Sequence, residues 1–381
     1  MKKKNDLLIL LLTVGVFGII NTEMGIIGIL PLVAKSFNVS LSTAGLLVSG
    51  FAFGVAIAGP TMPLIFSKMD RKKVMLLALG IFCLSNIITI FTHNFTLLLI
   101  ARIIPAFFQP VYVALAFTMA TQISKPEDSQ RAVARIFVGV SAGMVLGVPV
   151  TNFIATNFSF AAAMALFAII NTLVLLLTIF FVPSMPVSKP VSYGDQLGVL
   201  KTPALFLALV SVISLNAAVF GSYSYMSDFL STVSHFSANS ISILLLIYGV
   251  ANIIGNMIAG NTLSVKPRET VTVVPIIALG SYLLLFLLGD SAINTGALLI
   301  AIGVVAGVIG NINQYLISYT AKEAPDLANG LFLTSANLGT TIGTAVCGAL
   351  LDSFSISYIF IGAAVFLLTS SFLITAWKRF S

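Results

Sequence analysis

Apolar stretches of about 20 residues recur along the whole chain, and short polar segments separate them. A stretch of that length crosses the hydrocarbon core of a bilayer as a helix. Only 8% of the residues are charged, whereas a soluble domain carries about 25%. Lipid offers the backbone no hydrogen-bonding partner, so an open sheet is excluded, and the alternation typical of a membrane β-barrel is missing. The sequence therefore predicts an all-α, polytopic membrane protein.

The first apolar run begins like a signal peptide. A basic start, MKKKND, precedes LLILLLTVGVFGII. The run continues past Glu23 to Val33, however, and no A-x-A cleavage site interrupts it. We therefore expect an uncleaved first membrane helix.

The hydropathy pattern predicts twelve transmembrane helices in two six-helix bundles. The predicted spans are 7–34, 42–66, 74–93, 96–122, 132–156, 160–182, 204–230, 241–263, 270–289, 294–320, 328–351 and 355–377. A polar segment containing four prolines separates the sixth span from the seventh. The expected organisation is an N-terminal bundle over 1–182, a cytoplasmic linker over 183–203 and a C-terminal bundle over 204–381.

Lysine and arginine follow the alternation of the predicted loops. Segments such as SKMDRKK, SKPEDSQRAVAR and VKPRE carry them, and so do both chain ends. The intervening loops are nearly free of them, with Lys35 as the exception at one edge. By the positive-inside rule, both termini are cytoplasmic and the protein lies in a bacterial cytoplasmic membrane. The net charge of +7 is thus a topology signal, and no nucleic-acid partner is expected.

Two ionisable side chains fall well inside the predicted spans. Glu23 lies in the first span and Arg102 in the fourth. Ideal helices place them roughly 16 Å and 9 Å from the outer surface, so a direct or water-mediated pair is possible. Such groups are rare in membranes and mark ion or substrate pathways.

The two halves of the chain repeat each other. Ser67 and Ser264 hold the same offset in the loops after the second and eighth spans. Glycines recur every four residues in the fifth and eleventh spans, at Gly139, Gly143, Gly147, Gly339 and Gly343. Such spacing is common in helix packing, but its equivalent positions favour an internal repeat, as in many transporters.

The segments NTEMGIIGILPLVAKSF, YSYMSDFL and FSANSISILLLIYGVANIIGN carry a family resemblance. The chain resembles the major facilitator superfamily, and within it the drug–proton antiporters of the arabinose/sugar-efflux branch. The resemblance implies alternating access, an acid in span one and an arginine in span four. The family's loop motif, G-x-L-x-D-R-x-G-R, falls on residues 63–71, where only Arg71 matches. Asp70 and Arg71 are the candidate gating residues.

Glu23 and Arg102 are the candidate proton-coupling residues. Two interpretations remain open, a static buried ion pair and a proton carrier. The protonation of a membrane carboxylate depends on the water and the positive charge around it. Arginine stays protonated, so Glu23 would be the carrier, and Arg102 would tune it or contact the substrate.

Polar and aromatic residues share helix faces on spans that enclose the cavity in this family, at spacings of three and four. Hydrogen bonding between helices would explain each of them equally well. The candidate substrate-binding residues are Asn21, Gln109, Tyr112, Asn216, Phe220, Tyr223, Asn311 and Gln314.

No Walker loop, H-E-x-x-H motif or Cys/His metal spacing occurs in the sequence. We therefore expect no enzyme activity, cofactor or metal. The predicted function is proton-coupled efflux of a small neutral polar solute such as a sugar, nucleoside or purine. The alternatives are efflux of amphipathic, chloramphenicol-like drugs, a uniporter or importer, and a non-transporting membrane sensor. The expected partners are the solute, protons and the lipid bilayer, and we expect a monomer.

Overall fold

The computed structural model describes residues 2–124, 129–186, 200 and 202–380, and this part of the chain is helical with short connections and no strand. The helices are α1 (Lys2–Gly25), η1 (Ile26–Ile29), α2 (Leu30–Phe37), α3 (Leu41–Ile65), α4 (Arg71–Phe91), α5 (Phe95–Ala106), α6 (Gln109–Ile123), α7 (Ser129–Asn157), α8 (Phe160–Phe181), α9 (Pro203–Tyr223), α10 (Met226–Thr232), α11 (Ala238–Val265), α12 (Pro267–Leu288), α13 (Ala292–Thr320), α14 (Pro325–Ser353) and α15 (Tyr358–Trp377).

The predicted fold class is confirmed. Eleven helical segments among the described residues are long and apolar enough to cross a membrane. The remaining predicted span is α14, a helix of 29 residues rich in glycine, serine and threonine. It packs between α3 and α9, so less of its surface has to be apolar to lie in a bilayer.

Three predicted spans are interrupted in the structure. The span 7–34 consists of α1, η1 and α2, the span 96–122 of α5 and α6, and the span 204–230 of α9 and α10. Proline has no N–H group to donate and restricts the residue before it. Pro105 and Pro110 flank the second interruption, and Pro31 lies in the first turn of α2.

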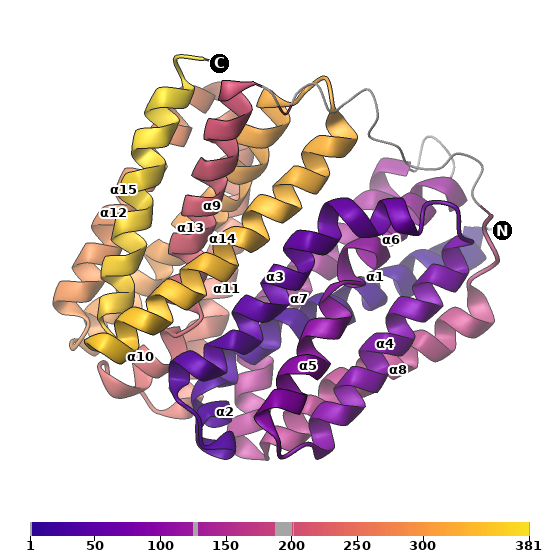
Figure 1. Ribbon diagram of the computed structural model, residues 1–381, viewed down its shortest axis with the longest axis horizontal. Helices are drawn as coiled ribbons and strands as arrows, with labels where there is room; N and C mark the ends of the chain where they lie inside the picture. The colour runs from indigo at the N-terminus through magenta and orange to yellow at the C-terminus, as the bar shows by residue number, and fades with distance from the viewer. Residues whose placement is uncertain (1, 125–128, 187–199, 201, 381) are drawn as a thin grey trace.

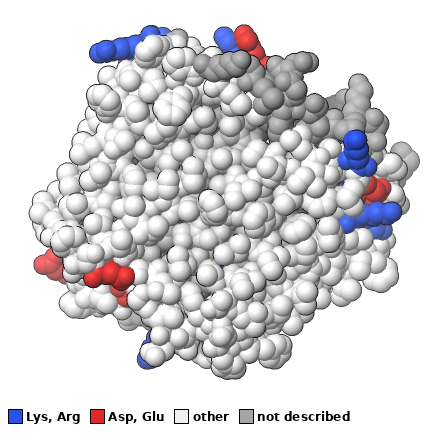
Figure 2. Space-filling view, in the orientation of Figure 1, with Lys and Arg blue, Asp and Glu red and all other residues white. Residues whose placement is uncertain are grey.

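The helices form two groups side by side (Figure 1). The helices α1 to α8 lie in one group and α9 to α15 in the other, and both ends of the chain lie along the same rim. Figure 2 shows lysine and arginine along that rim, with a broad uncharged band below it. We call this edge the basic rim; it includes Lys68, Arg71, Lys72, Lys73, Lys266, Arg268, Lys378 and Arg379. Most of the predicted linker, residues 187–199 and 201, lies outside the described residues.

Hydrogen bonds join the two groups at the rim opposite the basic rim. They run from Ser42 Oγ to Asp352, from Asn152 Nδ2 to Ser242 Oγ (2.8 Å) and from Asn157 Nδ2 to Asn239 Oδ1 (3.0 Å). Along α3 and α14 the contact continues inward, where Thr341 donates to the carbonyl of Ser49 (3.2 Å). These bonds hold the opposite rim closed.

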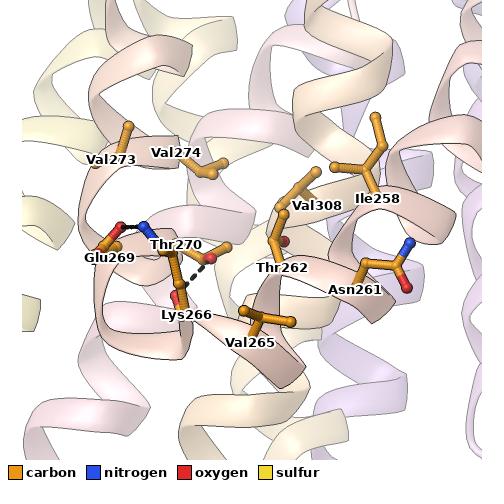
Figure 3. Close-up of a pocket in the computed structure, with 10 residues that line it drawn as sticks. All are labelled: Ile258, Asn261, Thr262, Val265, Lys266, Glu269, Thr270, Val273, Val274 and Val308. Carbon is orange, nitrogen blue, oxygen red and sulfur yellow. Dashed lines mark hydrogen bonds and ion pairs between the residues drawn. The ribbon is translucent and has the colours of Figure 1, made fainter.

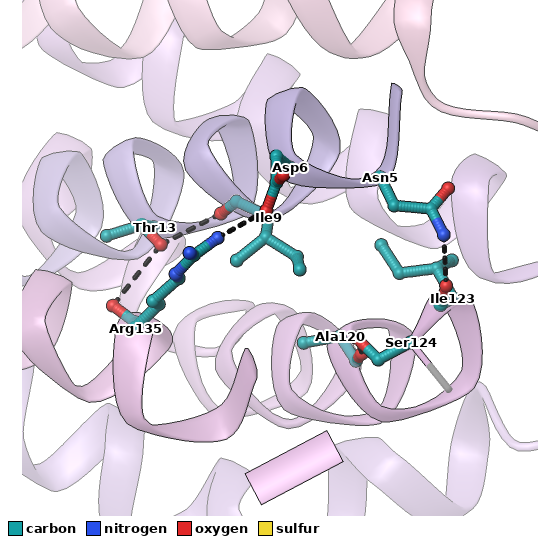
Figure 4. A network of polar contacts seen from close by, with 8 residues as sticks. All are labelled: Asn5, Asp6, Ile9, Thr13, Ala120, Ile123, Ser124 and Arg135. Carbon is teal, nitrogen blue, oxygen red and sulfur yellow. Dashed lines mark hydrogen bonds and ion pairs between the residues drawn. The ribbon is translucent and has the colours of Figure 1, made fainter. Parts of the chain in front are cut away.

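At the basic rim, α1 is tied to its own group. Asn5 Nδ2 donates to the carbonyl of Ile123 at the end of α6 (2.6 Å), and Asp6 pairs with Arg135 of α7 (2.6 Å) (Figure 4). Both ion-pair partners are about half exposed, and such pairs add little stability. They nevertheless hold the first turns of α1 against α6 and α7.

The predicted glycine stripes lie between helices at equivalent places in the two groups. A Cβ atom at Gly139 of α7 would lie 2.3 Å from the carbonyl oxygen of Thr13 in α1. A Cβ atom at Gly343 of α14 would lie 2.2 Å from the carbonyl oxygen of Ala217 in α9. The helix α7 (span five) therefore packs on α1 (span one) as α14 (span eleven) packs on α9 (span seven). This equivalence supports the internal repeat.

Gly343→Ala is expected to destabilise the protein. The added methyl group meets backbone, which cannot rotate away, and overpacking of this kind costs about 1–3 kcal/mol. The thermal unfolding midpoint in detergent should fall. Gly280→Ala is the matched control, because a Cβ atom there has open space around it. An equal midpoint for both variants would show that α9 and α14 can separate freely.

Candidate functional site

Arg102 binds the backbone of α1 where that helix changes course. Its Nη1 donates to the carbonyl of Thr22 (2.7 Å) and its Nη2 to the carbonyl of Glu23 (3.3 Å). The α-helix ends at Gly25 and continues as a 3-10 turn. The change of helix type disturbs the partners of these carbonyls, and the fork of the guanidinium replaces them.

The Glu23 carboxylate has a different partner. Its Oε2 accepts a hydrogen bond of 2.5 Å from Nε2 of Gln109. Both Glu23 and Arg102 are described, and no Arg102 nitrogen lies within 4.0 Å of a Glu23 carboxylate oxygen. The direct ion pair that the sequence allowed is therefore not formed. The two residues are joined through the backbone and through Gln109.

The interruption between α5 and α6 positions Gln109. This residue is the first of α6, directly after Phe107 and Phe108, where neither helix continues. The N-terminus of a helix carries partial positive charge from its free N–H groups. The Glu23 carboxylate therefore contacts the start of α6 through a neutral amide.

The Arg102 guanidinium is buried, with 2% of the residue exposed. Its central carbon lies 5.3 Å from the centroid of the Phe51 ring on α3. A cation above an aromatic face gains electrostatic energy, and the two carbonyls supply the rest of its surroundings. Arg102 is thus fixed by groups that carry no net charge.

Glu23 keeps part of its surface exposed in the middle of a span. Leu7 and Leu10, at the other end of α1, are 46% and 58% exposed. A helix turns about 100° per residue, so Glu23 lies about 160° around the helix from Leu7. The carboxylate therefore points away from the exposed apolar side of α1.

Several buried polar atoms of α1 and of helices that contact it have no partner among the described residues. Examples are Asn21 Nδ2, Arg102 Nε, Gln109 Oε1, Tyr112 Oη, Thr151 Oγ1 and Asn171 Oδ1. Buried polar atoms are normally satisfied by protein, water or ligand. The described residues contain no group of three His, Cys, Asp or Glu side chains that could hold a metal ion.

Three predicted binding residues lie between helices of their own group. The Asn21 side-chain oxygen would be 3.3 Å from a Cβ atom at Gly147, and the Asn216 Cβ 2.7 Å from one at Gly339. Tyr112 is fully buried with its hydroxyl against Gly15. Asn21 and Asn216 therefore hold equivalent positions beside the two glycine stripes.

The other candidates on α9 and α13 differ in exposure. Phe220 is half-buried, whereas Tyr223 is buried and stacks on the buried Tyr248 with ring centroids 4.6 Å apart. Gln314 is half-buried and donates to Ser318 (3.2 Å). Phe220 and Gln314 therefore keep part of their surface exposed on the second group of helices.

Asn311 belongs to a ladder of three asparagines, of which the sequence reasoning missed two. Its Nδ2 donates to Oδ1 of Asn256 (2.6 Å), and Nδ2 of Asn256 donates to Oδ1 of Asn252 (3.1 Å). We call Asn252, Asn256 and Asn311 the amide ladder. The four-residue spacing of the first two on one helix was the available signal.

The amide ladder borders open space beside α11. Asn256 is exposed, and the exposed Ile253 and Met257 lie near it around the same helix. Cβ atoms at Gly260, one turn further on, and at Gly310 of α13 would meet no atom within 4 Å. The two helices therefore leave room beside the ladder toward the basic rim.

The predicted gating residues lie at the start of α4 and contact α4, α6 and the segment after α8. Asp70 caps α4 by accepting from the amide of Lys73 (3.2 Å), and it accepts from the Ser184 hydroxyl (2.7 Å). Slight burial raises the pKa of Asp70, but these hydrogen bonds outweigh it and hold the pKa below its usual value. Their stabilisation is thus lost only on acidification through that lowered pKa. Arg71 donates to Gln122 of α6.

The sequence profile of the Major Facilitator Superfamily matches residues 12–332. Curated relatives span nearly the whole chain. An uncharacterized MFS-type transporter of Bacillus subtilis, YtbD, is 28% identical over 99% of this chain and 96% of its own length. The putative transporter AraJ of Escherichia coli is 26% identical, over 95% and 92%. A probable sugar efflux transporter of Helicobacter pylori is 25% identical, over 94% and 91%.

Solved structures show the same fold. The nucleoside transporter NupG superposes with a TM-score of 0.80, covering 99% of each chain at 15% identity. A bacterial homologue of the human lysosomal transporter Spinster, in an inward-facing and unoccupied conformation, gives 0.77 over 100% of this chain and 98% of its own, also at 15% identity. The profile match and the curated relatives confirm the family resemblance inferred from the sequence.

Proposed function

This chain belongs to the major facilitator superfamily, and we propose that it exports a small neutral polar solute in exchange for protons. It is a multi-spanning membrane transporter of a small molecule. We place the basic rim on the cytoplasmic side of a bacterial membrane, with both termini inside. The two bundles, 1–182 and 204–381, would rock about the site, and the linker 183–203 would join them.

The proposal of proton coupling depends on one observation, the separate hydrogen-bond partners of Glu23 and Arg102. The Glu23 carboxylate is held by the neutral amide of Gln109, whereas Arg102 is held by two backbone carbonyls. Glu23 can therefore gain or lose a proton without breaking an ion pair, and Arg102 stays in place in either state. In a static buried ion pair, the Glu23 carboxylate would instead contact the Arg102 guanidinium directly.

The amide ladder supports a neutral polar solute. Its amides both donate and accept hydrogen bonds, and they carry no charge to attract or repel an ion. Hydroxyls of a sugar, or the edge of a nucleobase, match such groups. A relative described as a probable sugar efflux transporter and the fold shared with a nucleoside transporter agree with this class of substrate.

Amphipathic drugs are the second candidate substrate class. The half-buried ring of Phe220 favours it, because aromatic faces bind planar apolar molecules. The remaining rivals predict no proton coupling. A sensor would give no flux, and a uniporter or importer would give flux that does not depend on a pH gradient.

The test uses purified protein in vesicles with an imposed pH gradient. Sugars, nucleosides, purines and chloramphenicol-like drugs are added one at a time, while a pH-sensitive dye reports proton movement. We expect proton release only with neutral polar solutes. Proton movement with drugs alone would favour the second substrate class, and flux without proton movement would contradict antiport.

Asn256→Ala is expected to raise the KM for the solute about tenfold. The change removes the central member of the ladder, and each hydrogen bond contributes about 0.5–1.5 kcal/mol. Radiolabelled uptake into everted vesicles measures this value. Asn294→Ala, at an exposed position near the start of α13, is the control. An unchanged KM in both variants would show that the solute does not bind beside α11.

A further inference from the structure

A groove lies on the second bundle between α11, α12 and α13, and Figure 3 shows ten residues that line it, Lys266 and Glu269 among them. It has a volume of about 450 Å³ and lies between the end of α11, the start of α12 and the middle of α13. A smaller hollow of about 340 Å³ shares Val265, Lys266 and Glu269 with it. The two hollows therefore adjoin each other where α11 meets α12, and mainly apolar side chains line the first while charged and aromatic ones line the second.

The apolar part of the groove faces the membrane. Val265, Val273 and Ile258 line it and are 76%, 50% and 42% exposed. It reaches Val308, which lies twelve residues before the end of α13 at Thr320. At 1.5 Å per residue this is roughly 18 Å from the rim. An acyl chain entering from the rim would thus lie along valine and isoleucine side chains.

The charged end of the groove has an excess of positive charge. Lys266 pairs with Glu269 at 3.2 Å, but both side chains are about two-thirds exposed. Arg268 lines the same end, is exposed, and has no carboxylate partner among the residues that the structure describes. Lys378, which donates to Thr272 of α12, adds a further cation at this end of the bundle. An anion can bind here without first displacing a buried pair.

Aromatic side chains mark this end as the level of the membrane surface. Tyr315, Tyr319 and Trp377 line the smaller hollow, where Tyr319 is 45% exposed and Trp377 is buried behind it. Tyr319 stacks on Tyr315 (5.5 Å between centroids) and meets Trp377 edge-on (5.8 Å). Tyrosine and tryptophan gather where lipid headgroups begin. The basic residues therefore lie at headgroup depth, and the valines lie at acyl-chain depth.

We propose that this groove binds an anionic phospholipid of the cytoplasmic leaflet. Its phosphate would contact Lys266 and Arg268, and one acyl chain would lie along Val265, Val273 and Val308. Basic pockets between membrane helices on this side bind such headgroups. A free phosphate ester would use the cations but leave the apolar groove empty. The site is separate from Glu23 and does not depend on which solute is exported.

Native mass spectrometry of the purified full-length protein tests the site. Phosphatidylglycerol is titrated against phosphatidylcholine with the same chains. The double variant Lys266→Gln/Arg268→Gln should weaken phosphatidylglycerol binding about 30-fold. The control Lys68→Gln/Lys73→Gln removes the same charge from the first bundle and should change it less than threefold. Equal losses in both double variants would overturn the proposal.

Two further variants examine the groove and the sign of its charge. Val273→Phe fills the apolar part and should weaken phosphatidylglycerol binding, whereas Val250→Phe, elsewhere on the exposed side of α11, should not. Glu269→Gln removes the competing carboxylate and should tighten binding, a gain that misfolding cannot imitate. Binding of glycerol phosphate as tight as that of the lipid, or no preference over phosphatidylcholine, would refute a lipid site.

Discussion

Replacing Glu23 by glutamine is expected to reduce export driven by a pH gradient to the level of empty vesicles. Glutamine has the same length as glutamate and can still accept from Gln109, so the helix break and the contacts of Arg102 should survive. It cannot take up or release a proton. The measurement is solute uptake into everted vesicles, together with the dye signal for proton movement.

Exchange of labelled for unlabelled solute separates the proton step from substrate binding. With no pH gradient, Glu23→Gln should still exchange solute, because rocking with bound solute needs no change in protonation. Glu323→Gln, a carboxylate exposed at the basic rim, is the control and should keep both activities. Gradient-driven export at the normal rate in Glu23→Gln would remove this residue from the mechanism.

The spans could be predicted from the sequence because each must be long and apolar on its own. The breaks needed a different signal. Pro105 and Pro110 were an available signal for the break between α5 and α6, although the hydropathy pattern predicted one unbroken span there. No proline lies at Ser224 or Tyr225, where α9 ends. Hydropathy averages over a window, so it does not detect a local change of helix type.

The partners of Glu23 could not be predicted for the same reason. Depth estimates assume two unbroken helices, whereas α1 ends at Gly25 and α5 ends at Ala106. The first break makes backbone carbonyls available to Arg102, and the second brings Gln109 to the carboxylate. The sequence singled out Glu23, Arg102 and Gln109, which lie close together in the structure, but the bonds between them follow from irregular backbone.

The spacing of three and four residues, which places side chains on one helix face, was a weaker guide to the predicted substrate-binding residues. Asn21 and Asn216 lie on helix faces that the glycine stripes cover, so a polar residue on a shared face is not thereby accessible. Asn311 lies on a face that also meets α11, and its partner Asn256 belongs to another span. A single helix pattern cannot indicate which neighbour covers each face, because that depends on how the bundle packs.

Arg102→Lys is expected to lose most export although it keeps the positive charge. Lysine has one ammonium group and cannot span the carbonyls of Thr22 and Glu23 as the planar guanidinium does. At least one buried carbonyl would lose its partner, at a cost of about 1–3 kcal/mol. The contact with the Phe51 ring would also weaken. We expect a lower unfolding midpoint and a displaced Glu23, measured by thermal unfolding and by pH-driven uptake.

Arg379→Lys, at an exposed position on the basic rim, is the matched control and should change neither quantity. Comparing unfolding with transport separates two roles of Arg102. If only charge mattered, lysine would restore export even in a less stable protein, because its ammonium group would still act on Glu23 electrostatically. If the fork of Arg102 sets the break in α1, both quantities fall together, and raising the pH gradient does not recover export. Full export by Arg102→Lys would show that the carboxylate is positioned by Gln109 alone.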